Sequence, residues 1–175
     1  MLYYKKNQGL TFLIKCDNRK RKIIKMQVDK ALYLKFPAVL RDKLLNNEIE
    51  LPETTQFEYD NLYTYRAVER KADDYTEVTL EDFRSYFDLH KIPKTPRGLS
   101  ENYTKNPHYY GVSSFLKREI VEQKMKFPNP KKKMAAGYVY SAGGPQNTND
   151  QHVCWWLYDG VDVSGFKLIE EKKDE

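Results

Sequence analysis

Gln151-His-Val-Cys-Trp-Trp-Leu-Tyr-Asp-Gly160 is the stretch of sequence that decides how this chain folds. It holds both tryptophans, one of the two cysteines and one of the three histidines of the 175 residues. The apolar run 153–158 predicts a buried strand, and the Asp-Gly pair at 159–160 predicts a tight turn after it. We therefore expect the rest of the chain to pack around this strand.

The two tryptophans and the histidine of this stretch have different expected roles. Because successive side chains of a strand point to opposite faces, at most one of Trp155 and Trp156 belongs to the main core. The other covers a second layer, a ligand or a partner surface. His152 lies at the polar entrance of the strand, where it either satisfies a buried backbone group or faces a substrate.

The composition bounds the class of protein. A chain of 20.8 kDa with 40% hydrophobic residues is long enough for one compact domain. No window approaches the roughly 18 consecutive apolar residues of a membrane span, and the N-terminus lacks a secretory signal, which predicts a cytoplasmic protein without a membrane segment. Cys16 and Cys154 are expected to be buried thiols, since two distant cysteines form neither a disulfide framework nor a zinc site. No metal is expected.

The net charge of +5 is unevenly distributed, and positive charge gathers at two places. One interpretation is that these patches bind nucleic acid or an acidic protein partner through phosphates or carboxylates. The other is that they are solvated lysines. The fourteen tyrosines leave open a third role in assembly. The patches are Arg19, Lys20, Arg21 and Lys22, and Lys131, Lys132 and Lys133.

The predicted class is α+β, with one main domain that carries a mixed or antiparallel sheet and a few short helices. Residues 1–55 are predicted to form a basic extension, with a hairpin of strands 10–16 and 22–28 and a short helix, 36–45. Residues 56–171 are predicted to form the main domain, and 172–175 a frayed tail.

The main domain is expected to alternate short strands and helices. Strand 62–69 places Arg66 on a face with apolar neighbours. Thr79 is predicted to cap a helix that runs through Phe87, and Ser113 or Ser114 a second helix up to 125. The remaining predicted segments are an irregular loop at 91–108, a strand at 134–140, a loop at 141–150 and a strand at 166–170.

The sequence lacks the motifs of several common nucleotide-binding, metal-binding and hydrolase sites. The chain has no Walker loop, dinucleotide glycine fingerprint, His-Glu-x-x-His helix or cysteine knuckle. Its three histidines, at 90, 108 and 152, are scattered in sequence. Gly111-Val-Ser-Ser-Phe115 lacks the second glycine of a hydrolase nucleophile elbow.

One ordering of residues carries a functional prediction. Arg66 lies on an early strand, the paired hydroxyls Ser113 and Ser114 lie at a strand-to-helix corner, and His152 leads a later strand. This order resembles the ADP-ribosyltransferase-like superfamily, in its arginine–serine–glutamate branch, over roughly residues 62–171. The resemblance implies that the fold is ADP-ribosyltransferase-like, that NAD is a substrate, and that no metal is needed.

The resemblance also implies site residues. Arg66 would hold the phosphates or ribose of NAD, because a guanidinium binds a pyrophosphate bidentately. Ser113 and Ser114 would order the nicotinamide ribose, and Tyr109 would line the same cleft. His152 stands where the family has a catalytic glutamate, so it would polarise the ribose by hydrogen bonding.

Two functions from different classes of protein are therefore predicted. The first is a divergent NAD- or nucleotide-binding protein that transfers ADP-ribose to a macromolecular target or hydrolyses NAD, such as a small bacterial or phage effector. Because Asp150-Gln151-His152 replaces the Glu-x-Glu of the family, whether it is an enzyme stays open. The alternative is a non-enzymatic basic module for nucleic acid or an acidic protein. The oligomeric state is not indicated.

Overall fold

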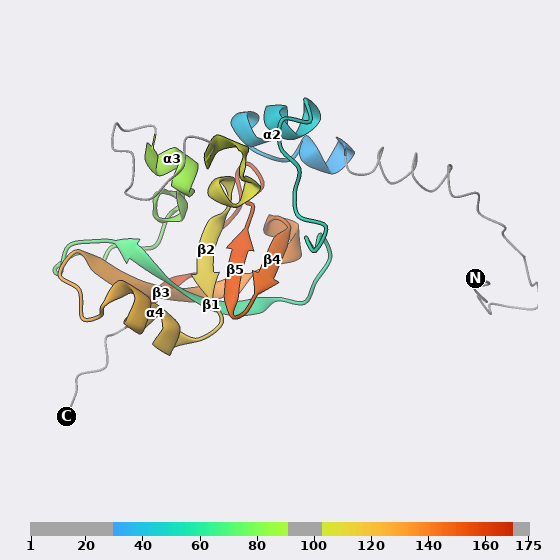
Figure 1. The fold of residues 1–175 in the computed structure, drawn as a ribbon. Helices are drawn as coiled ribbons and strands as arrows, with labels where there is room; N and C mark the ends of the chain where they lie inside the picture. The colour runs from blue at the N-terminus through green and yellow to red at the C-terminus, as the bar shows by residue number, and fades with distance from the viewer. Residues whose placement is uncertain (1–29, 91–102, 170–175) are drawn as a thin grey trace, which may run out of the picture. The chain divides into compact units, whose positions relative to one another are not determined.

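The computed structural model describes residues 30–90 and 103–169 (Figure 1). The predicted hairpin with Arg19, Lys20, Arg21 and Lys22, together with Cys16 and the tail 172–175, lies outside the described residues. The chain divides into two compact units, 1–34 and 35–175.

The second unit is built on one antiparallel sheet of six strands in the order β4-β5-β2-β1-β3-β6. This confirms the α+β class, and of the two predicted kinds of sheet the antiparallel one is found. In Figure 1, β4, β5 and β2 run side by side, and β1 and β3 run across them in another direction. The strands are β1 Leu62–Glu69, β2 Val112–Phe115, β3 Lys132–Val139, β4 Gln146–Asn149, β5 His152–Trp155 and β6 Lys167–Ile169.

Short helices connect and cover these strands. The α-helices are α2 Ala38–Leu45, α3 Tyr86–His90 and α4 Arg118–Met125, and the 3₁₀ turns are η1 Leu80–Phe83, η2 Tyr103–Lys105, η3 Pro107–Tyr110 and η4 Ser141–Gly143. The helix predicted at 36–45 is therefore present, with Leu40 and Leu44 buried.

The two faces of the sheet have separate cores. On one face, Val121 of α4 packs with Phe115 and Met134. On the other, Trp155 and Phe166 form the centre of a larger cluster that includes Phe83 of η1. The burial pattern of β1 alternates as predicted, with Thr64, Arg66 and Val68 buried on the second face.

The tryptophan stretch forms the expected buried strand, but it is shorter than predicted. The strand ends at Trp155. The backbone N–H of Trp156 still donates to the carbonyl of Pro145, 3.0 Å away, but proline has no N–H with which to extend the ladder. Both tryptophans are buried, and only Trp155 belongs to the main cluster, as predicted. The indole of Trp156 instead donates to the Pro107 carbonyl at 2.8 Å and so anchors η3. Cys154 is a buried free thiol, as expected.

Three local predictions are wrong. The loop predicted at 141–150 contains the strand β4, which the polar sequence does not indicate. Its buried polar side chains have partners, as where Gln146 donates to Gln56 at 2.6 Å. Ser113 and Ser114 do not cap a helix, because both lie within β2 and α4 begins only at Arg118, after Lys117. The helix predicted through Phe87 is two elements, η1 and α3. The capping box at Thr79 is present, but it starts the 3₁₀ turn.

Candidate functional site

A cavity of about 470 Å³ lies where β1 and β2 part. The two strands pair at Tyr65 opposite Phe115, and beyond this pair both of them contribute to the lining of the cavity. The other lining residues come from segments 84–89 and 106–111, from Met125 at the end of α4 and from the start of β5. We call it the Arg66 cavity. It brings together four of the five predicted site residues, namely Arg66, Tyr109, Ser113 and His152.

Arg66 is the dominant charge of this cavity. Its residue is 9% exposed, and its Nε and Nη1 atoms are buried without a hydrogen-bond partner among the described residues. The guanidinium lies 4.5 Å from the centre of the Phe83 ring, which gives a cation–π contact but no neutralising charge. Burial lowers the pKa of Arg66 to about 10, and the charge of Asp82 opposes this shift. Arg66 is therefore still a cation at neutral pH.

The carboxylate of Asp82 accepts its hydrogen bonds from residues other than Arg66. Arg70 donates to both of its oxygens, from Nε at 2.9 Å and from Nη2 at 2.5 Å. The backbone N–H of Thr79 donates to Oδ2 at 2.9 Å, which completes the capping box of η1. Asp82 thus acts on Arg66 at a distance only, and Nε and Nη1 of Arg66 keep no hydrogen-bond partner among the described residues.

Ser113 and His152 form a hydrogen-bonded pair on the neighbouring strands. Their Oγ and Nε2 atoms are 3.0 Å apart. The register places Ser113 opposite Cys154, so His152 is its diagonal neighbour on the same face of the sheet. Burial lowers the pKa of His152, and the charges of His108 and Lys124 add to this effect. The imidazole is therefore neutral at pH 7.

The turn η3 supplies residues that the sequence reading did not assign to the site. Asn106 accepts a hydrogen bond from the His108 N–H at 3.0 Å, and Pro107 begins the turn. His108 lines the cavity, and burial lowers its pKa. Asn before Pro is a recognisable start signal for a helical turn, so this corner could have been found in the sequence. The sequence does not indicate, however, that this turn and β1 line the same cavity.

The lining of the cavity is basic. Its positive charges are Arg66 and Arg84, and none of the described lining residues is an aspartate or glutamate. The carboxylate of the Glu-x-Glu motif thus has no counterpart among the described lining residues. Nor do the described residues contain any group of three or more histidines, cysteines or carboxylates that could hold a metal.

Two predicted sets of residues lie apart from this cavity. Ser114 points to the opposite face of β2, where it is 3% exposed and its hydroxyl has no partner among the described residues. In the Lys131–Lys133 run, Lys133 lies 3.4 Å from the centre of the Tyr75 ring, and Lys132 approaches the sulfur of Met125 at 3.7 Å. Two of these three lysines therefore make intramolecular contacts.

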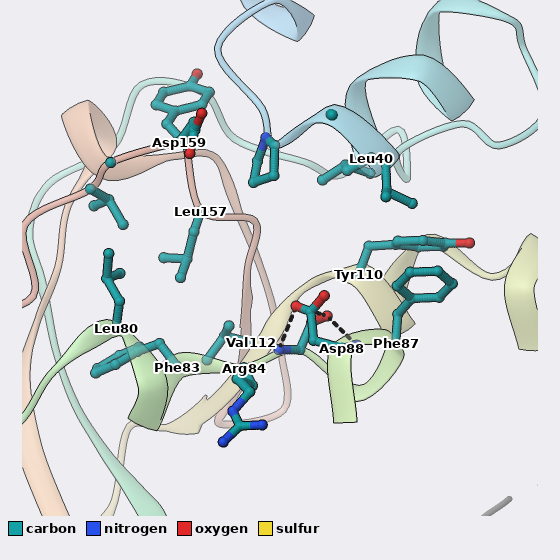
Figure 2. Close-up of a pocket in the computed structure, with 17 residues that line it drawn as sticks. Leu40, Leu80, Phe83, Arg84, Phe87, Asp88, Tyr110, Val112, Leu157 and Asp159 are labelled. Carbon is teal, nitrogen blue, oxygen red and sulfur yellow. Dashed lines mark hydrogen bonds between the residues drawn. The ribbon is translucent and has the colours of Figure 1, made fainter. Parts of the chain in front are cut away.

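A second cavity, of about 380 Å³, is lined in part by Leu80 and Phe83 of η1 (Figure 2). Leu40, Val112 and Leu157 reach it from three separate segments, and its walls are mainly apolar. Two carboxylates, Asp88 and Asp159, line it, and Asp88 accepts hydrogen bonds from Ser85, whose hydroxyl is 2.7 Å away. This cavity shares Arg84 with the Arg66 cavity, but its described lining residues offer no comparable buried charge without a partner.

The comparisons with known proteins name no relative. No protein-family model matches the chain, and no curated protein or solved structure matches it either. No helix in the described part of the chain is both long and apolar enough to cross a membrane.

Proposed function

We propose that the Arg66 cavity binds the phosphate groups of a nucleotide of the NAD class. The observation that carries this proposal is a buried guanidinium that lines a cavity and has two hydrogen-bond donors without partners. Leaving such donors unpaired is costly, and a bound anion would satisfy them. A phosphate or pyrophosphate matches the fork of donors that arginine presents.

The surroundings of Arg66 suit the rest of such a ligand. A volume of about 470 Å³ lies within the usual range of small-molecule pockets. The basic lining favours an anion, and the rings of Tyr86 and Tyr109, 5.4 Å apart, offer an aromatic wall for a base or a nicotinamide. Size, charge and aromatic lining are thus all compatible with a dinucleotide or part of one.

The order of the site residues along the chain is the basis for the proposed reaction. Arg66 lies on β1, Ser113 on β2 and His152 on β5, which is the order that led to the ADP-ribosyltransferase-like resemblance. Transfer of ADP-ribose to a macromolecule, or hydrolysis of NAD, is the reaction that this resemblance implies. In that reaction a neutral His152 would accept a hydrogen bond from a ribose hydroxyl, in place of the missing glutamate.

Isothermal titration calorimetry with NAD and ADP-ribose tests the binding. We expect heat with both ligands, and at least tenfold weaker binding for Arg66→Lys, because lysine keeps the charge but loses the fork. Arg118→Lys is the matched control, since Arg118 pairs with Glu122 on α4, away from the cavity lining. Absence of heat with both ligands contradicts the proposal.

The reaction needs its own measurement. Release of nicotinamide from NAD, followed by chromatography, would show turnover, and an acceptor mixture would show transfer. The alternative of a basic module for nucleic acid or an acidic protein stays a prediction, because its main patch lies outside the described residues. Polarisation titrations at two salt concentrations separate the two, since binding to a phosphate backbone weakens steeply with salt.

A further inference from the structure

The Ser113–His152 pair has the geometry of a nucleophile with its base. A separation of 3.0 Å between Oγ and Nε2 is within reach for proton transfer. Both residues line the Arg66 cavity, and Ser113 is exposed, so a bound molecule has access to its hydroxyl. Binding a nucleotide would not by itself require this pair.

We infer that Ser113 is a covalent nucleophile for phosphoryl transfer, with His152 as its general base and Arg66 as the group that binds the phosphoryl oxygens. The inference rests on the proposed binding of phosphate in this cavity and goes beyond it, because it assigns a reaction at phosphorus. The substrate class is an anionic phosphodiester or phosphoanhydride.

The first half of the reaction forms a phosphoserine ester. His152 Nε2 accepts the proton of the Ser113 hydroxyl as Oγ forms a bond to phosphorus. The bond from phosphorus to the leaving oxygen breaks, and His152 returns the proton to that oxygen. Arg66 stabilises the charge that builds on the other phosphoryl oxygens.

The second half restores the enzyme. A water molecule gives a proton to His152 as its oxygen attacks phosphorus, and the bond between phosphorus and Ser113 Oγ breaks. The serine oxygen takes the proton back from His152. The sum is hydrolysis of one phosphoester bond by one water, with no change of oxidation state.

The charges around the Ser113–His152 pair favour attack on an anionic phosphorus substrate over attack on a neutral ester or amide, as in a serine protease. His152 faces His108 and Lys124, which are basic, and its ring packs on Phe115 at 5.1 Å between centres. No carboxylate is among the described residues that line the cavity. An anionic phosphorus substrate would supply the negative charge that this basic lining lacks, whereas a neutral ester would not.

Hydrolysis of bis(4-nitrophenyl) phosphate by the full-length chain tests the inference. We expect release of nitrophenolate, and intact-mass and peptide analysis of quenched samples should place a nitrophenylphosphoryl group on Ser113. Ser113→Ala should abolish the adduct and lower the rate at least 100-fold, and His152→Gln should lower the rate at least tenfold. Ser164→Ala is the matched control, because Ser164 lies in an exposed turn outside the cavity.

The outcomes separate this inference from the proposed function. NAD binding without nitrophenolate release, or release that Ser113→Ala leaves unchanged, overturns the role of Ser113 and leaves the binding proposal standing. An adduct on Ser113 without NAD binding supports the nucleophile and removes the NAD assignment. Thermal melting of each variant confirms that it is folded, and an adduct on any other residue also overturns the inference.

Discussion

Arg70 holds both carboxylate oxygens of Asp82 and so keeps this acid away from Arg66. Arg66 lies within β1 and Arg70 directly follows this strand, but the two arginines have different surroundings. Arg70 also donates to Asp74 at 3.0 Å, whereas two donor atoms of Arg66 have no partner among the described residues. One arginine thus neutralises the nearby carboxylates, and the other is the one that the proposed function assigns to a ligand.

Removal of Arg70 is expected to weaken ligand binding through Asp82. In Arg70→Met the freed carboxylate can pair with Arg66 and compete with a phosphate, so we expect about tenfold weaker binding of NAD by calorimetry, or about 1.4 kcal/mol. The double variant Arg70→Met with Asp82→Asn should regain most of this affinity. A purely structural role for Arg70 predicts the opposite, because the second change would then add damage.

Replacement of Arg66 by methionine is expected to raise stability while it removes binding. Methionine fills similar volume without a buried charge, so the free energy of unfolding in urea should rise by on the order of 1 kcal/mol. Loss of the cation–π contact with Phe83 opposes this gain. A fall of more than about 1 kcal/mol would show that Arg66 is a structural ion and not a binding residue.

The parts of the fold that depend on local pattern were predictable. Alternation in β1 placed Arg66 on the buried face, and Thr79 with its acid three residues later marked the start of a helical turn. The strand β4 was missed because its buried polar side chains bond to residues about ninety positions away, such as Gln146 with Gln56. A pattern of neighbouring residues does not indicate a hydrogen-bond partner that is so distant in sequence.

The candidate site was predictable in its residues but not in its chemistry. The order of Arg66, Ser113 and His152 along the chain indicated one site, and they line one cavity. Ser114 was included because paired hydroxyls look alike in sequence, although a strand sends neighbours to opposite faces. The unpaired state of Arg66 depends on Arg70 taking Asp82, and only the structure places those three side chains.

A substitution at Gly137 tests how closely β3 packs against Phe166 of the core. A Cβ at this position would lie 2.5 Å from Cγ of the Phe166 ring, so Gly137→Ala forces the ring or the strand to move. We expect a loss of about 2 kcal/mol in the free energy of unfolding, measured by urea denaturation. Gly165→Ala is the matched control, because nothing lies within 4 Å of its Cβ, and it should change stability by less than about 0.5 kcal/mol. Equal effects of the two variants would contradict this packing.

The two histidines of the cavity should make stability depend on pH. Burial lowers the pKa of His108 and of His152 below the ordinary 6.5, so the unfolded chain binds protons first as the pH falls. The free energy of unfolding should therefore be highest above about pH 7 and decrease as the pH falls through 6.5 towards the folded-state values. Asp74 and Asp162, whose pKa values are also lowered, lose their contribution only near and below pH 4, so the two effects separate.

Urea unfolding of wild type and His152→Gln between pH 5 and 8 measures the contribution of His152. We expect a shallower slope in the variant, because it lacks one of the two groups that take up protons on unfolding. The groups that face His152 and add to its shift are His108 and Lys124. If Lys124→Gln leaves the slope unchanged while His152→Gln reduces it, burial is the dominant cause. An identical slope in wild type and His152→Gln would mean that His152 is as readily protonated in the folded chain as in the unfolded one. The neutral imidazole that the reaction at Ser113 needs would then be lost over the same pH range as for a free histidine.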